Sequence, residues 1–196
     1  IFESVKMKKL VYRSSVILLF LALTLGVYIY HQIFSSLTNS DKIILVPSGT
    51  SYSELKDTLR SNNLLNNEVV FDVFCSKKNY NTIYPGRYLV NSHMDLNSLV
   101  NILRLGAQKP LNIIFNNTST IYDLAGKLSY QIEADSLDLL DAFRNELFYS
   151  TYDFNEASIR KLFIPNTYEV YWTITPLEFL ERMQKEYNRF WSKDRL

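Results

Sequence analysis

The longest apolar stretch of the chain runs from Val16 to Phe34 and contains no Asp, Glu, Lys or Arg. As a helix it would extend roughly 28 Å, close to the thickness of one hydrocarbon core. A helix pairs its own backbone polar groups, as a segment in lipid must. The pattern therefore predicts a transmembrane helix over residues 16–34.

The two flanks of this stretch differ in charge. Only Lys42 follows it closely, whereas several basic residues precede it, namely Lys6, Lys8, Lys9 and Arg13. The positive-inside rule then makes residues 1–15 a cytoplasmic tail and places residues 39–196 outside. Tyr28 and Tyr30 stand where interfacial aromatic residues gather. A cleaved signal peptide and a buried soluble helix are the alternatives, but the apolar core is long for a signal peptide and no small-x-small site follows it.

Residues 43–106 follow a polar linker over residues 35–42 and show alternating strand and helix signals. The expected order is strand, helix, helix, strand and helix, with the elements starting at Ile43, Ser51, Asn67, Tyr84 and Asp95. Ser51 with Glu54 forms a capping box, and Gly106 is a natural end for the last helix. The apolar spacing predicts these core positions: Tyr52, Leu55, Leu59, Val70, Phe71, Phe74, Cys75, Leu96, Leu99, Val100, Ile102 and Leu103. Residues 76–82 are expected to form a polar loop.

The second half of the chain partly repeats the first. Residues 43–59 align without gaps on residues 112–128, strand on strand and helix on helix. The two strands could therefore pair in one sheet, with coincidence as the alternative. Further helices are expected over residues 136–148, with Leu137, Leu140, Phe143 and Leu147 inward, and over residues 155–162.

The final segments are an extended stretch and a helix. FIPNTYEVYW (residues 163–172) indicates a turn entering a strand, and Thr175, Pro176 and Glu178 mark a strongly capped helix start. The expected apolar face of that helix comprises Leu177, Leu180, Met183, Tyr187 and Phe190. This face lacks an evident partner later in the chain, so we expect a truncated domain.

Composition narrows the classes of function. The net charge is +1, so the chain as a whole has no strong electrostatic attraction to nucleic acid. Cys75, the one cysteine, lies in an apolar run and is expected to be a core residue rather than a reactive thiol. No zinc spacing, phosphate loop or G-x-S-x-G elbow occurs, and neither a metal nor a cofactor is implied.

Several motifs in this order resemble one family. VPSGTSYSELKDTLRSNNLLNNEVVF, YPGRYLVNSHMDLNSLVNILRLG and FIPNTYEVYW follow the basic tail and apolar helix. Together they are similar to the N-terminal part of the YceG-like endolytic murein transglycosylases. Residues 116–119 depart from the family's E-G-x-T turn. No segment between Trp172 and Leu196 matches the family's S-i-I-E-x-E helix, so the resemblance places the catalytic Glu beyond Leu196.

The resemblance implies an α+β fold. Its parts would be an N-terminal transmembrane helix, a LysM-like βααβ subdomain over residues 43–106, and the truncated start of a mixed α/β catalytic domain over residues 107–196. The implied protein is a single-pass inner (plasma) membrane enzyme whose main part is periplasmic or extracytoplasmic. It would cut the MurNAc–GlcNAc β-1,4 bond of nascent peptidoglycan strands, leave 1,6-anhydro-MurNAc ends, and meet cell-wall synthesis proteins. The alternatives are a non-enzymatic, membrane-tethered peptidoglycan-binding or assembly module, and an anchored domain without a carbohydrate role.

The candidate substrate-binding residues are Asn166, Thr167 and Tyr168, which match the family's l-F-P-d-T-Y motif. Tyr168 and Trp172 are more readily explained by core packing, since they alternate with exposed positions, and Tyr171 could stack on a sugar. No Glu is assigned a catalytic role: Glu169 is expected to face solvent, Glu178 to cap a helix, and Glu181 and Glu186 to lie on a polar helix face. Residues 48–51 are a further candidate for glycan contact, although capping already explains Ser51.

Overall fold

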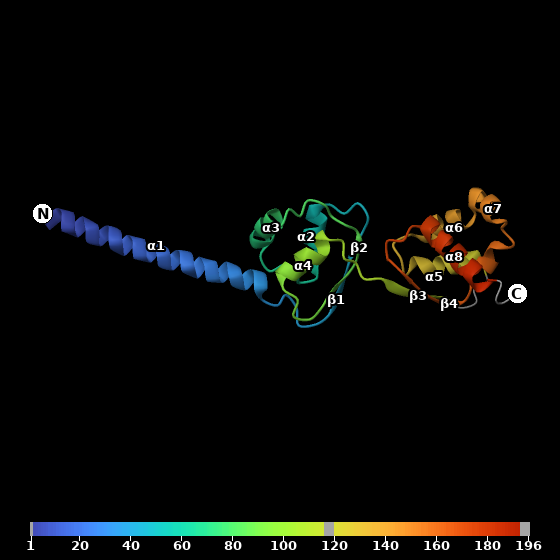
Figure 1. Cartoon of the computed structure of the whole chain (residues 1–196), viewed down its shortest axis with the longest axis horizontal. Coiled ribbons are helices and arrows are strands. Elements are labelled where there is room, and N and C mark those ends of the chain that lie inside the picture. Colours follow the sequence, from blue (N-terminus) through green and yellow to red (C-terminus); the bar gives the residue numbers. More distant parts are fainter. Residues whose placement is uncertain (1, 116–119, 193–196) are drawn as a thin grey trace. The chain divides into compact units, whose positions relative to one another are not determined.

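The computed structural model of the chain describes residues 2–115 and 120–192 (Figure 1). It contains two compact units. Unit 1 comprises Ile1–Ile44, Ser51–Ile83 and Leu89–Leu105, and unit 2 comprises Leu45–Thr50, Tyr84–Tyr88 and Gly106–Leu196.

Helix α1 (Phe2–Phe34) contains the predicted membrane span. Within it, Tyr12–Phe34 has a mean hydropathy of 2.0 and is long and apolar enough to cross a membrane. The span ends at the predicted residue and begins before Val16. Its apolar side chains are exposed in the structure, for example Leu18, Phe20 and Leu21, as expected of a helix whose partner is lipid.

The segment after α1, for which the sequence predicts a polar linker over residues 35–42, makes backbone contacts with residues 93–95. Ser36 forms a β-bridge with Asp95, and the Leu37 N–H donates to the Met94 carbonyl at 2.9 Å. Leu37 is buried, as is Thr38, whose carbonyl accepts from the His93 N–H at 2.8 Å. Polar composition concealed this because the pairing uses backbone groups, which every residue carries.

The order of elements in the first half is as predicted. It runs β1 (Lys42–Val46), α2 (Tyr52–Ser61), α3 (Glu68–Lys77), β2 (Gly86–Val90) and α4 (Leu96–Arg104), with β1 beside β2 in a two-stranded sheet. The caps Ser51, Asn67 and Asp95 each accept a backbone N–H, and Ser51 forms the full capping box with Glu54. Gly106 has φ +61, the conformation of a helix-ending glycine.

The core of unit 1 is built by the three short helices. Its fully buried side chains include Ile44, Leu55, Leu59, Leu64, Phe71, Leu99, Val100 and Leu103. Tyr52, Val70, Phe74 and Ile102 also belong to the predicted inward positions and are half-buried. The expected loop at residues 76–82 instead begins within α3 and contains the buried Tyr80. Cys75 is buried as predicted, and burial raises the pKa of its thiol to about 11.

Unit 2 contains the second sheet. Its elements are β3 (Leu111–Phe115), α5 (Ile121–Ser129), α6 (Ser136–Phe143), α7 (Glu146–Tyr152), the 3-10 helix η1 (Ile159–Leu162), β4 (Asn166–Val170) and α8 (Pro176–Phe190). β3 pairs antiparallel with β4, with Ile113 opposite Tyr168. The internal repeat thus predicts local structure correctly, but the expected pairing of its two strands is wrong. Each strand pairs with the later strand that helps close its own core.

The predicted helix over residues 136–148 is divided in two. Asn145 caps α7 by accepting the Phe148 N–H at 2.8 Å, since asparagine competes for backbone donors. In the second helix Leu147 is exposed rather than inward, while Phe148 is buried, and Leu137 at the start of α6 is exposed as well. The segment at residues 155–162 is helical only over η1.

The core of unit 2 is one cluster that includes helix α8. Its members include Ile113, Leu124, Leu128, Leu139, Phe143, Ile159, Leu162, Phe163, Phe179, Leu180 and Met183. α8 contacts α6 and η1, so the expectation that its apolar face lacks a partner is wrong. Two of the positions assigned to that face, Leu177 and Phe190, are exposed, and Phe179 is buried instead.

The start of α8 provides a prediction about pH. The Thr175 N–H and hydroxyl donate to the Glu178 carboxylate at 2.9 and 2.8 Å, and these bonds lower the pKa of Glu178 below its ordinary value of 4.5. A carboxyl whose pKa is lower in the folded state than in the unfolded state adds stability at pH values above its unfolded-state pKa. This stability is lost as the pH falls through its folded-state pKa. We expect Glu178→Gln to lower the urea midpoint of tryptophan fluorescence at about pH 6 but not at about pH 3. The exposed Glu181→Gln is the control; equal losses at both pH values would contradict the prediction.

Candidate functional site

A polar cleft of about 720 Å³ lies in unit 2 between strand β4 and the C-terminal half of α8. Its lining comes from the segment that enters and forms β4 and from one side of α8. The lining residues are Ile164, Asn166, Thr167, Tyr168, Glu169, Arg182, Glu186, Arg189, Phe190 and Ser192. The cleft therefore brings together all three predicted binding residues and a charged group that the sequence did not single out.

β4 supplies the predicted residues in two different ways. Asn166 and Thr167 are exposed and present polar groups, whereas Tyr168 is buried. The Tyr168 hydroxyl donates to the Ile164 carbonyl at 2.6 Å across Pro165. Burial raises the pKa of Tyr168, and the nearby Glu186 charge adds to the rise, while Arg182 opposes it. Tyr168 is thus an uncharged residue at the bottom of the cleft, and its hydroxyl holds the turn before β4 in place. Its burial agrees with the core position that the alternating pattern predicted.

This hydrogen bond can be tested by deletion. We expect Tyr168→Phe to lower the free energy of unfolding by about 0.5–1.5 kcal/mol, because one intramolecular hydrogen bond is lost and the ring is kept. Urea denaturation followed by tryptophan fluorescence would measure the change. Tyr171→Phe is the matched control, since Tyr171 is half exposed. A loss of equal size in the control would contradict a special role for the Tyr168 hydroxyl.

α8 supplies a charged row. Arg182 and Glu186 lie 3.1 Å apart at i,i+4, and Arg189 lies 3.7 Å from the other Glu186 oxygen at i,i+3. The Glu186 side chain is 21% exposed, while that of Arg189 is 83% exposed. The two guanidinium groups therefore orient the Glu186 carboxylate. Each also has N–H donors that this ion pair does not use and that could bind a ligand. The sequence signal was the Arg-x-x-x-Glu-x-x-Arg spacing, which places all three groups on one helix face.

The other candidate carboxylates occupy the places expected of them. Glu169 is exposed, although it lines the cleft, and Glu181 is exposed. Glu178 is fully explained by the capping box of α8. Glu186 lies on the polar face of α8, as expected, where it is mostly covered and bridges two arginines.

The candidate contact at residues 48–51 is already engaged within the protein. The Ser48 N–H and hydroxyl donate to the two Glu133 oxygens at 2.5 and 2.8 Å, both residues belonging to unit 2. The Thr50 hydroxyl donates to the Pro47 carbonyl, and Ser51 caps α2. The structure therefore gives these side chains internal roles. The turn at residues 116–119 lies outside the described residues.

Comparison with known proteins places the chain in a family. No curated protein matches its sequence. A crystal structure of a yceG-like protein from Listeria monocytogenes aligns with a TM-score of 0.41 and 18% identity, over 81% of this chain and 58% of that one. The chain thus spans less than two thirds of that protein's length. The sequence model of the YceG-like family matches residues 44–196, most of the chain, and so the chain belongs to the YceG-like family.

Proposed function

We propose that this chain serves in a membrane-anchored lytic transglycosylase of peptidoglycan. The reaction would cleave the MurNAc–GlcNAc β-1,4 bond of nascent glycan strands and leave 1,6-anhydro-MurNAc ends. The observation that carries the proposal is the family match over residues 44–196. The helix at Tyr12–Phe34 supports anchoring in the inner (plasma) membrane. The basic residues before it support a cytoplasmic N-terminus and an extracytoplasmic main part.

The proposed chemistry needs one carboxyl group that acts first as acid and then as base. It protonates the leaving oxygen and later accepts the proton of the sugar's own 6-hydroxyl, which requires a pKa raised by burial. In residues 2–115 and 120–192, the carboxylates of the cleft are exposed or engaged by arginine. We therefore assign the described cleft to glycan binding and the catalytic carboxyl to a residue outside the described part.

The cleft offers groups suited to a saccharide. Arg182 and Arg189 present planar donors for acetamido carbonyls, hydroxyls and the carboxylates of stem peptides. Asn166 and Thr167 can both donate and accept. The order β1-α2-α3-β2 supports a LysM-like subdomain that would add a second glycan contact. Cell-wall synthesis proteins are the proposed partners.

A non-enzymatic, membrane-tethered glycan-binding module is the second candidate. It is favoured by one observation: the cleft's carboxylates among the described residues lack the deep burial that a general acid needs. Both candidates predict binding to peptidoglycan, and only the first predicts a new chain end.

The deciding experiment incubates the protein expressed from its intact gene, reconstituted in lipid nanodiscs, with uncrosslinked nascent glycan strands. Mass spectrometry would detect 1,6-anhydro ends, and co-sedimentation with purified sacculi would measure binding. Binding with anhydro ends supports the transglycosylase, and binding without them supports the tethered module. The absence of binding would overturn both. Strands whose MurNAc 6-hydroxyl is acetylated are the control, because they cannot form the anhydro ring.

A further inference from the structure

The last turn of α1 packs against the short helices of unit 1, the unit to which α1 belongs. α1 contacts both α3 and α4, as can be followed in Figure 1. Gln32 shares a small pocket with Leu65, Asn67 and Val70, at the start of α3. The start of α3 therefore lies beside the end of the apolar span.

The connection between α1 and unit 1 leaves little freedom for these parts to separate. The Ser36–Asp95 bridge follows α1 directly, and Leu37 is buried under it. Gln32 lies two residues before the end of the span, about 3 Å along the helix axis. If the span crosses a bilayer, the first turn of α3 is held at the depth of the lipid headgroups.

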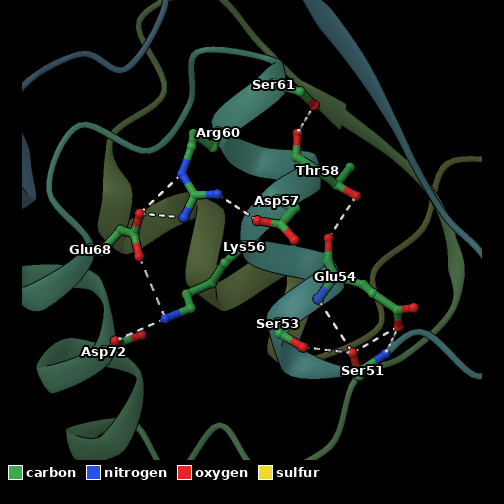
Figure 2. Close-up of polar contacts among 10 residues, drawn as sticks. All are labelled: Ser51, Ser53, Glu54, Lys56, Asp57, Thr58, Arg60, Ser61, Glu68 and Asp72. Carbon is green, nitrogen blue, oxygen red and sulfur yellow. Dashed lines mark hydrogen bonds and ion pairs between the residues drawn. The ribbon is translucent and has the colours of Figure 1, made fainter.

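The acidic side chains of α3 lie on the side of the helix that faces α2. The Lys56 ammonium lies 3.1 Å from Asp72 and 3.7 Å from Glu68, and Arg60 also pairs with Glu68. Figure 2 shows both carboxylates turned toward these cations. The negative charge of α3 is thus neutralised on the side that faces the protein.

Another side of α3 is apolar and exposed. Val69 is 72% exposed and Val73 is 54% exposed, one helical turn apart. Lys77 follows one turn later, and the Lys78 ammonium lies 5.4 Å from the centre of the Phe74 ring. Apolar side chains beside lysines, with the acidic groups paired to cations on another side, resemble the arrangement of a helix that lies on a membrane.

We propose that α3 lies on the surface of the bilayer that holds α1, with Val69 and Val73 among the headgroups and Lys77 near lipid phosphates. The inference rests on the membrane anchoring in the proposed function and goes beyond it. The occupant of this face is lipid because the face begins beside the end of the span. Contact would fix the height and orientation of unit 1 above the membrane.

The test places a fluorescent label at one introduced cysteine in each variant of the full chain, in vesicles of phosphatidylcholine and phosphatidylglycerol. Nitrobenzoxadiazole would be attached in the variants Val69→Cys, Val73→Cys and Leu105→Cys. The native Cys75 is buried with its pKa raised to about 11, so it remains an inert thiol. Leu105 is the matched control, since it is 67% exposed and lies beyond the far end of α4.

Lipids spin-labelled at the headgroup should lower the fluorescence at positions 69 and 73 by about twofold or more and leave position 105 nearly unchanged. Lys77→Glu should weaken the quenching at position 73, because anionic lipid then repels the helix end. Equal quenching at all three positions would indicate general adsorption and overturn the proposal.

A fourth label, at Leu21→Cys in α1, separates the two proposals. Quenching there by lipids spin-labelled in the acyl chain, without quenching at positions 69 and 73, overturns the α3 contact and leaves the anchor intact. No quenching at position 21 overturns the anchor and, with it, the contact.

Discussion

Phe179→Ala should destabilise unit 2 by about 3–5 kcal/mol, the range for removing a fully buried aromatic ring. Phe179 is completely buried and stacks on Phe163 with a centroid distance of 6.3 Å. Its ring also lies 6.5 Å from that of Phe143. The change would leave a cavity where α8 meets α6 and η1, and those elements also support the cleft.

Tryptophan fluorescence suits this measurement because the chain's two tryptophans, Trp172 and Trp191, both belong to unit 2. Urea denaturation of the full chain in detergent would compare wild type with Phe179→Ala. Leu177→Ala on the same helix is the control; Leu177 is 47% exposed, so its loss should stay within about 0.5 kcal/mol. A loss below about 1 kcal/mol for Phe179→Ala would show that the ring is not packed as described.

The second large effect concerns the cleft. Replacing both Arg182 and Arg189 by alanine should weaken binding of glycan strands by about tenfold or more, because each charged hydrogen bond contributes about 1.5–3 kcal/mol. Binding of the full chain to solubilised glycan strands would be measured by isothermal titration. The folded state should hardly change, since exposed ion pairs contribute only about 0–1 kcal/mol.

Two controls make this result specific. Lys185→Ala removes a cation from the same helix, but Lys185 is exposed and does not line the cleft. Replacing both arginines by lysine keeps the charge and removes the planar fork, so binding should stay weak if the fork is what recognises the ligand. If Lys185→Ala reduced binding as much as the double variant, general electrostatic attraction would explain the affinity and the cleft would lose its role.

The helix starts could be predicted from the sequence because a cap is a local interaction. Ser51, Asn67, Asp95 and Thr175 each accept a backbone N–H from within their own helix. A few neighbouring residues contain all the groups involved. The apolar span of α1 and the strand at Asn166–Val170 were visible for the same reason, since their patterns need no distant partner.

The charged half of the cleft could not be predicted in this way. The spacing of Arg182, Glu186 and Arg189 shows that they share a helix face, but many solvated faces have such a pattern. Their meaning depends on β4, the element just before α8, folding back to lie opposite this part of the helix. Asn166, Thr167 and Tyr168 were proposed only because they match a family motif.

Local chemistry thus determined the elements of this protein, their caps and the apolar span, since each depends on groups a few residues apart. Strand pairing and the burial of Leu37 depended on which distant groups came together. Backbone donors and acceptors are the same at every residue, so composition cannot reveal which of them will pair. Burial depends on what covers a face, and Phe179 rather than Leu177 was covered because α6 and η1 pack against that side of α8.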